Sequence, residues 1–423
     1  MQCGFLFYQS PVPNFPLFCS VQFKDITGQK EVKQQLVELV KHNRLSHALL
    51  FLGKEGSGAL ALAIAFAQYM VCETVHGKAK ATGSSLFEPD PEPSSTIETK
   101  EDSCGRCAPC TKADKLVHPD IHFSYPVIPR KSGDKPLSTD YISEWREFVQ
   151  QYIYGNVYDW LQFIGAENKQ GNITAHECND IIRKLNLKSF ESEYKILIMW
   201  MPEYLGNEGN KLLKVIEEPP ANTLFILVAE NESLILPTIL SRCQLVKIPA
   251  MTNTEIAEGL VEKSKLSPEK AKQVASISDG NYREALQLIQ HAEEDWQDLL
   301  REWLNAVLKT GPVAQVKWIE EIAKLGREKQ KQFLRYFNHL LEQSIRLRIT
   351  GEDSDNSFLP EKERDFALRL NKLAGIGQQQ AIIEELDKAA YYIERNAHAK
   401  MLFHALTIKL YHIIADKSLI LTN

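Results

Sequence analysis

Hydrophobic positions near the start of the chain follow first a helical and then an extended pattern. Between residues 28 and 44, apolar side chains recur three or four positions apart, which predicts an amphipathic helix. Residues 48–52 form an uninterrupted apolar run that predicts a buried strand, and the Ala- and Leu-rich residues 59–71 predict a second helix. A glycine-rich turn joins this strand to the second helix. The order strand, glycine turn, helix is that of a phosphate-binding loop.

Further strands are predicted in the middle of the chain. Residues 195–199 and 224–229 are apolar runs of strand length, and 244–248 has a strand-like pattern. Between the first two, residues 209–218 are predicted as a helix that ends at a pair of prolines. Strands that alternate with helices predict a mostly parallel sheet with helices on both faces, so we expect an α/β fold.

The pattern becomes entirely helical after residue 249, and this change suggests the domain boundaries. We expect an α/β domain over 21–249, a small helical domain over 250–295 and a larger helical domain over 296–423. The small domain includes a helix with Ser267 as its N-cap and Pro268 in its first position.

Three segments fall outside this pattern. Residues 1–20 hold no charged side chain and are interrupted by prolines, so we interpret them as an uncertain N-terminal extension, with Val21 near the natural start, and not as an export signal. Residues 76–103 are rich in Pro, Ser, Thr, Glu and Lys and are expected to form a flexible surface insertion. Residues 126–187 form a second insertion, irregular at first and then helical.

Composition and charge exclude several classes of protein. The chain has 423 residues, of which 44% are hydrophobic and 25% charged, so neither a single small module nor wholesale disorder fits. No apolar run reaches the roughly 18–20 residues that span a bilayer, and we expect a cytoplasmic protein. A net charge of −6 argues against strong nucleic-acid binding by the chain alone.

The glycine turn has the spacing of a phosphate-binding loop without its reactive side chains. Gly53, Gly56 and Gly58 give the turn its backbone shape. In the pattern G-x-x-x-x-G-K-[ST], the lysine contacts phosphate oxygens and the hydroxyl ligates Mg²⁺. Ala59 and Leu60 occupy these two places. We therefore expect no ATP hydrolysis at this loop. The alternative interpretation is an ordinary glycine-rich turn between a strand and a helix, which the three glycines alone do not exclude.

Cysteine spacing indicates a metal site. Three of the eight cysteines form C-x-x-C-x-x-C, and a fourth ends the helix predicted upstream: Cys104, Cys107, Cys110 and Cys72. In a chain without an export signal such a cluster is typical of metal ligands in a reducing compartment, and Zn²⁺ held by four thiolates is favoured. His118 and His122 are rival ligands, and an iron–sulfur cluster is a rival metal centre.

Four motifs, in order along the first half of the chain, resemble those of the bacterial clamp-loader subunits of the AAA+ family. They are Phe23–Gln29 (FKDITGQ), Ser46–Gly53 (SHALLFLG), Leu212–Pro220 (LLKVIEEPP) and Leu236–Cys243 (LPTILSRC). The resemblance implies an AAA+ α/β domain followed by a helical lid (250–295) and a helical collar (296–423). It also implies a zinc module formed by the four cysteines above.

Within this family, the departures resemble the delta prime type more than the gamma/tau motors. A motor would have an Asp-Glu pair after the strand at 195–199, and Trp200 and Met201 stand there instead. The loop lysine, the metal-binding hydroxyl and the acidic pair are thus all missing, which implies no ATPase activity of its own. Glu203 is a conceivable displaced acid, but a solvated loop residue is the preferred interpretation.

The resemblance assigns roles to two arginines. Arg242 lies in Ser-Arg-Cys, where the family places an arginine finger that reaches the neighbouring subunit's ATP. Arg283 corresponds to the family's second sensor, which faces nucleotide in motor subunits. Because the loop lacks the lysine and the metal-binding hydroxyl, three interpretations of Arg283 are open. It is a remnant of the sensor without function, an interdomain ion-pair partner or a residual nucleotide contact.

The resemblance also implies partners and a process. We expect a non-hydrolysing subunit in a heteropentamer with gamma/tau and delta subunits, which loads the sliding clamp onto primer-template DNA for DNA polymerase III. Two alternatives stay open from the sequence, an ATP-hydrolysing gamma/tau-like motor and a zinc-containing AAA+ DNA-binding regulator.

Overall fold

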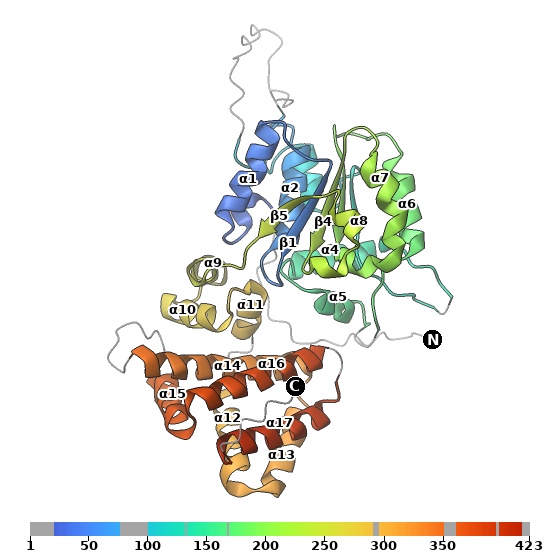
Figure 1. Cartoon of the computed structure of the whole chain (residues 1–423). Coiled ribbons are helices and arrows are strands. Elements are labelled where there is room, and N and C mark those ends of the chain that lie inside the picture. Colours follow the sequence, from blue (N-terminus) through green and yellow to red (C-terminus); the bar gives the residue numbers. More distant parts are fainter. Residues whose placement is uncertain are drawn as a thin grey trace, which may run out of the picture. The chain divides into compact units, whose positions relative to one another are not determined.

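A five-stranded parallel sheet forms the centre of the first half of the chain in the computed structural model (Figure 1). The strand order is β2-β3-β4-β1-β5. The strands are β1 Ala48–Gly53, β2 Ile121–Ser124, β3 Lys195–Trp200, β4 Thr223–Ala229 and β5 Gln244–Ile248. The structure describes residues 21–76, 100–131, 133–166, 169–290, 296–350, 361–394 and 397–416.

Helices cover both faces of this sheet, because its central strands β3 and β4 are apolar after their first residue. Every residue of β3 and β4 is buried. On one face lies α2 (Ala59–Val71), which is buried along its whole length and contacts β1, β3 and β4. On the other face, α6 (Ala175–Leu185) and α7 (Leu213–Glu217) share a core with the sheet. The expected α/β fold with a parallel sheet is confirmed.

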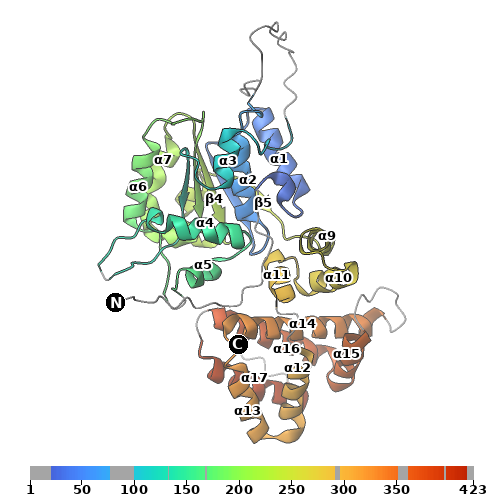
Figure 2. The ribbon, with the colours of Figure 1, turned by 180° about the vertical axis from the view of Figure 1, so that it is seen from behind.

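The α/β part also contains further α-helices and short 3₁₀ helices among its described residues. Those not yet given are η1 Phe23–Asp25, α1 Lys30–Lys41, α3 Ala108–Asp114, η2 Ser138–Tyr141, α4 Ile142–Gln151, α5 Val157–Phe163, η3 Pro202–Leu212, η4 Glu232–Leu234 and α8 Pro237–Leu240. Seen from behind, α3 lies beside α2 (Figure 2).

Several predicted elements are confirmed and two need correction. The second helix is observed at the predicted residues, and β1, β3, β4 and β5 lie within one residue of their predicted ends. The helix predicted over 209–218 is instead the end of the 3₁₀ segment η3 followed by the short α7. Strand β2 was not predicted, because it has only four residues and pairs with β3 alone.

An aromatic cluster orders most of the insertion at 126–187. Trp145 of α4 stacks on Tyr125 with ring centroids 4.0 Å apart, and meets Trp160 of α5 edge-on at 5.3 Å. Trp200 at the end of β3 lies 5.2 Å from Trp145. The indole Nε1 of Trp160 donates to the backbone oxygen of Pro126 at 2.7 Å. The insertion is therefore fastened to the sheet by buried rings.

The chain divides into two compact units. One comprises the described residues up to Ser267 together with 280–284, and the other comprises 268–279 and the described residues from 285 onward. The remaining helices are α9 Asn253–Ser264, α10 Pro268–Ile277, α11 Tyr282–Gln290, α12 Trp296–Asn305, the π-helix η5 Ala306–Thr310, α13 Pro312–Ile322, α14 Arg327–Thr350, α15 Glu361–Leu373, α16 Ile376–Glu394 and α17 Ala399–Ile414. The division into three domains at 249 and 295 stays a prediction.

Stacked tryptophans form the centre of the second unit. Trp303 and Trp318 lie face to face with ring centroids 4.6 Å apart, and Phe333 packs against both. One side of α17 leaves large apolar side chains exposed, with Met401 at 72% and Ile408 at 57% of their full accessibility. The expected helical C-terminal region is confirmed. Part of the apolar surface of α17 is not buried in the core of this unit.

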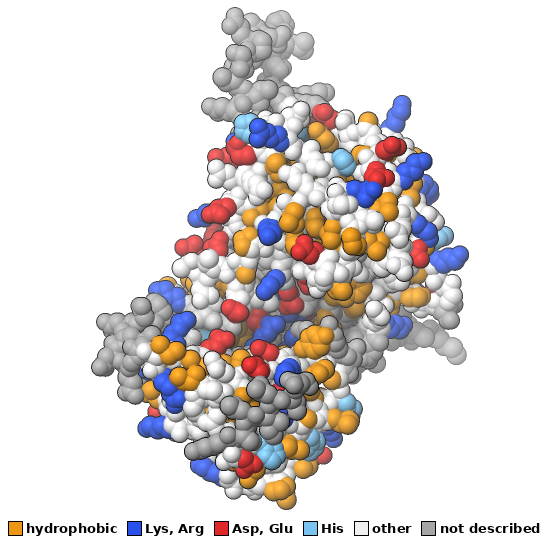
Figure 3. Space-filling model, in the orientation of Figure 1, with side chains coloured by type: hydrophobic (Ala, Val, Ile, Leu, Met, Phe, Trp, Pro, Cys, Tyr) orange, Lys and Arg blue, Asp and Glu red, His pale blue; other side chains and the backbone are white. Residues whose placement is uncertain are grey.

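The surface carries mixed charge. On the face in Figure 3, Lys and Arg side chains of the described residues are interspersed with Asp and Glu. Among the described helices, none combines the length and the apolar character needed to cross a membrane. Residues 1–20, most of the insertion at 76–103 and the tail after Asp416 lie outside the described residues.

Candidate functional site

The glycine turn links β1 to α2 in left-handed backbone conformations. Gly56 and Gly58 have φ angles of +73° and +85°, which residues with a side chain adopt at a cost. Gly58 directly precedes the first residue of α2, and Ala59 and Leu60 begin the helix as buried residues. The cradle shape that the spacing predicts is present. Ala59 and Leu60, which occupy the places of the lysine and the hydroxyl residue, have no polar side-chain group to direct into the cradle.

The chain's own residues fill this cradle. The ring of Tyr154, from the segment before α5, comes within 3.0 Å of the place that a Cβ on Gly58 would take. The side chain of Asn281 lies even closer to the place that a Cβ on Gly56 would take. The remaining cavity, lined by the loop, Tyr154, Trp200 and Met201, has about 30 Å³. That is the room of about one water molecule, whereas ligand pockets usually have roughly 300–1,000 Å³.

Arg283 is committed to two carboxylates at the edge of this cradle. It binds Asp159 of α5 with two N–H groups, Nε to Oδ2 at 2.5 Å and Nη2 to Oδ1 at 2.6 Å. Its Nη1 donates to Oε1 of Glu55, a residue of the glycine turn, at 2.9 Å. Arg283 is only 3% exposed. Arg283 is thus an ion-pair partner within its own compact unit, and its three interpretations from the sequence stay predictions.

Glu55 joins three further parts of the chain. It accepts hydrogen bonds from the amides of Asn281 at 3.2 Å and Asn156 at 3.1 Å, besides its bond to Arg283. The backbone N–H of Tyr282 also donates to the carbonyl oxygen of Gly56 at 3.2 Å. The turn is thus held closed by a network of partly buried polar groups.

Sequence reasoning missed three residues of this closed site: Glu55, Tyr154 and Asp159. Glu55 occupies a variable position of the loop pattern, so no motif singles it out. The other two belong to the insertion at 126–187, which had no predicted role. Asn156 and Asp159 form a capping box at the start of α5, and this signal could have placed a helix there but not its contact with the glycine turn.

The end of β3 has no acidic pair facing the cradle. Trp200 packs into the aromatic cluster, and Met201 adopts a left-handed backbone with φ of +59°. Glu203 is a correction to the sequence analysis, which preferred a solvated loop residue. Its Oε1 accepts from the backbone N–H groups of Glu230 at 2.7 Å and Asn231 at 2.9 Å, and burial raises the pKa of its carboxyl. Glu203 therefore anchors the turn after β4.

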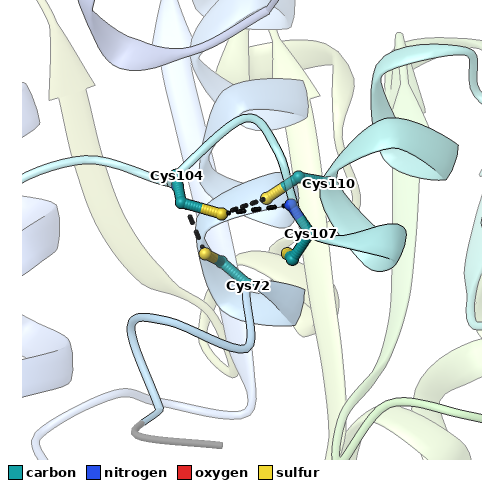
Figure 4. Close-up of side chains that lie close together, drawn as sticks. All are labelled: Cys72, Cys104, Cys107 and Cys110. Atoms are coloured by element: carbon teal, nitrogen blue, oxygen red, sulfur yellow. Dashed lines mark hydrogen bonds between the residues drawn. The ribbon is translucent and has the colours of Figure 1, made fainter. Parts of the chain in front are cut away.

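The four predicted cysteines meet at one point, where α2 ends and α3 begins (Figure 4). Their Sγ atoms all lie within 4.8 Å of one another, and those of Cys104 and Cys110 are 3.9 Å apart. A tetrahedral ion with Zn–S bonds of about 2.3 Å requires sulfur atoms about 3.8 Å apart. The donor set and its spacing fit a single zinc ion.

Backbone N–H groups point at two of the four sulfur atoms. The backbone N–H of Cys104 points at Sγ of Cys72, and that of Cys107 at Sγ of Cys104, each at 3.3 Å. A hydrogen bond from the Cys110 thiol lowers the pKa of Cys72 to about 4, and the same bond raises the pKa of Cys110. One sulfur is thus already suited to carry negative charge, as a metal ligand must.

The rival histidine ligands are not part of this cluster. His118 is buried with its Nε2 atom 3.3 Å from a carboxylate oxygen of Glu191, and its Nδ1 accepts from the backbone N–H of Asp120 at 3.1 Å. Burial lowers the pKa of both His118 and His122. Among the described residues, the group of possible metal ligands around Cys72 contains cysteines alone.

The cysteine loop also holds the start of the α/β domain. Asp102 accepts from the backbone N–H groups of Phe23 at 3.1 Å and Lys24 at 3.0 Å, and the amide of Gln22 donates to the hydroxyl of Ser103 at 3.2 Å. Ser103 is 4% exposed. Asp102 and Ser103, which were predicted to lie in the flexible surface insertion, are thus hydrogen-bonded to the start of the α/β domain.

Arg242 lies on the surface between α8 and β5, with its side chain 31% exposed. Its Nε donates to Oε1 of Glu217 at 2.7 Å, and its Nη2 donates to the same oxygen. Its Nη1 donates to the backbone oxygen of Thr238 at 2.6 Å. The guanidinium is therefore accessible and held in one orientation.

The fold is a parallel α/β domain with a glycine loop after β1, followed by a helical C-terminal region. This is the fold class of P-loop NTPase-like domains with a helical extension. Residues 28–86 and 94–252 match the family described as "DNA polymerase III, delta subunit". This match covers more than half of the chain. The chain belongs to this family and is a clamp-loader subunit of the AAA+ family.

Particular relatives include both subunit types. The chain is 26% identical to DNA polymerase III subunit tau of Bacillus subtilis over 78% of this chain and 48% of the relative. It is 25% identical to subunit delta' of the same organism over 63% of this chain and 60% of the relative. It is 23% identical to subunit delta' of Escherichia coli over 80% of this chain and 81% of the relative. The match thus spans about half of the tau relative and three fifths of the B. subtilis delta' relative.

Proposed function

We propose that this chain is a delta prime type clamp-loader subunit that hydrolyses no ATP. The observation that carries the proposal is the closed cradle, in which Tyr154, Asn281 and the Arg283 network occupy the room where a nucleotide would sit. A motor needs a lysine and a metal-binding hydroxyl directly after the last glycine of the loop and an acidic pair at the end of β3. This chain has Ala59 and Leu60 at the first two positions and Trp200 and Met201 at the others.

The proposed contribution to catalysis is made in trans. Arg242 acts as an arginine finger at the ATP site of an adjacent gamma/tau motor, within a heteropentamer that also contains delta and loads the sliding clamp onto primer-template DNA. A partly exposed guanidinium that is hydrogen-bonded to its own chain supports this role, because a finger must be accessible and pre-ordered when it meets phosphate.

The proposed cofactor is one structural Zn²⁺ held by Cys72, Cys104, Cys107 and Cys110. Four thiolates complete the tetrahedral shell and leave no position for water, so the ion would fasten the loop without taking part in chemistry. The close approach of the sulfur atoms favours one ion over an iron–sulfur cluster, in which the thiolates bind separate irons.

Replacing Arg242 by alanine tests the proposed function. In the complex reconstituted with motor and delta subunits, ATP turnover stimulated by clamp and primed DNA should fall. The loss at the adjoining ATP site should be roughly 10³-fold or more, because a finger supplied in trans contributes about that much. Turnover by the whole complex should fall only in part, since the other sites do not receive Arg242. Steady-state phosphate release measures both the wild type and the variant.

Two results would contradict the proposal. Unchanged turnover with Arg242→Ala, in a complex that still assembles, would show that this arginine is not a finger. ATP turnover by the isolated chain, lost on substitution of Gly58, would identify a gamma/tau-like motor instead. Arg130→Ala removes another partly exposed arginine of the same unit and serves as the control.

The exposed side of α17 is the part of the collar that we propose faces partner subunits. Met401, Ile408 and Tyr411 lie on this side and are 72%, 57% and 42% exposed. Ile408→Glu should weaken assembly by about tenfold or more, because a charge in an apolar contact is costly. Gln380→Glu adds the same charge on α16 and should have little effect. Sedimentation of the mixed subunits measures assembly, and equal assembly of both variants would refute the contact.

A further inference from the structure

The contacts of Arg242 leave one edge of its guanidinium for an external ligand. The bonds to Glu217 use Nε–H and one N–H of Nη2. Nη1 donates to the carbonyl oxygen of Thr238 at 2.6 Å and to the hydroxyl of Ser241 at 3.3 Å. Arginine has five N–H donors, so the second N–H of Nη2 remains for an incoming oxygen. The 3.3 Å bond to Ser241 is the weakest of the four and the easiest to exchange.

The two main partners of this guanidinium stand on elements that share one core. Glu217 is the last residue of α7, directly after the buried Val215 and Ile216. Thr238 lies in α8 beside Ile239, which is 1% exposed. Val215, Ile216 and Ile239 belong to the same hydrophobic cluster. Both acceptors are thus fixed by burial of their neighbours, although Glu217 itself is half exposed.

We propose that Glu217 is the positioning residue for Arg242. This inference rests on the proposed function, since it concerns how the finger is presented to the adjacent ATP site. A free arginine side chain populates many rotamers. The carboxylate removes that freedom before the subunits meet and turns Nη2 toward the partner. A displacement of only 1 Å in such a group costs on the order of 10²-fold in rate.

The test compares four variants in the reconstituted complex. Glu217→Ala should lower the kcat of the adjoining ATP site about tenfold and leave the KM for ATP unchanged, because positioning acts in the transition state. Glu217→Gln should retain most of the activity, since its amide oxygen still accepts from Nε and Nη2. Glu218→Ala is the matched control, an exposed neighbour of the same type, and should have no effect. Arg242→Ala gives the loss expected when the finger is absent.

A double variant separates this inference from the function on which it rests. If Glu217 acts only through Arg242, Glu217→Ala combined with Arg242→Ala should be no slower than Arg242→Ala alone. If Arg242→Ala leaves turnover unchanged, the arginine finger itself is refuted. If Arg242→Ala lowers turnover but Glu217→Ala does not, or raises it, only the positioning role is refuted. Losses that add in the double variant, or a Glu217→Gln as slow as Glu217→Ala, refute it equally.

Discussion

Replacing Cys110 by serine is expected to abolish zinc binding and to unfold the cysteine loop. A structural thiolate site contributes on the order of 10 kcal/mol to folding, and serine is a poor ligand for zinc. Because the loop also holds Gln22, Phe23 and Lys24 through Ser103 and Asp102, the start of the domain should loosen with it. Elemental analysis of the purified protein should give one zinc per wild-type chain and none in the variant.

The same loss should appear in the melting temperature. A loss of several kcal/mol lowers Tm by roughly 10 °C or more, because about 1 kcal/mol corresponds to roughly 2–4 °C in a unit of this size. Cys178→Ser is the matched control, a fully buried cysteine of α6 outside the cluster, and it should keep its zinc. Equal metal content in the two variants would refute the four-cysteine site. Iron in the wild-type protein would instead establish the rival metal centre.

Replacing Arg283 by alanine is expected to open the closed cradle. The substitution leaves Glu55 and Asp159, whose side chains are 22% and 14% exposed, without the cation between them. Breaking a buried ion pair in this way costs about 3–5 kcal/mol, because the remaining charges stay partly desolvated. Amide hydrogen exchange should accelerate in the glycine turn and in residues 280–284, and the melting temperature should fall.

Neutral substitution of all three partners is the control for this prediction. Arg283→Met with Glu55→Gln and Asp159→Asn leaves no unpaired charge and should cost much less. Arg130→Ala breaks an exposed pair with Glu144 and should cost no more than about 1 kcal/mol. Mg-ATP should not stabilise Arg283→Ala, because the loop still lacks its lysine and hydroxyl. A rise in Tm with Mg-ATP would show that the cradle can still bind nucleotide.

The sequence predicted those features that depend on local pattern. Burial of β3 and β4 on both faces requires uninterrupted apolar runs, and such runs can be read from the sequence directly. The C-x-x-C-x-x-C spacing identified three of the clustered cysteines, and the end of α2 supplied the fourth. The short β2 was not predicted, because four residues carry little periodicity, and the end of η3 was predicted as an α-helix because it has the composition of one.

The sequence by itself determined strands β1, β3, β4 and β5, the glycine turn without its lysine, and the C-x-x-C-x-x-C part of the cysteine cluster, because each depends on neighbouring residues. Only the tertiary structure decided that the cradle is filled, and that Glu203 is an anchor. It also decided that Arg242 forms an ion pair with Glu217. These features join residues 25 to more than 200 positions apart, such as Arg242 with Glu217 and Arg283 with Glu55. Such pairs meet only when the chain folds, since burial of the apolar faces brings the separate segments together.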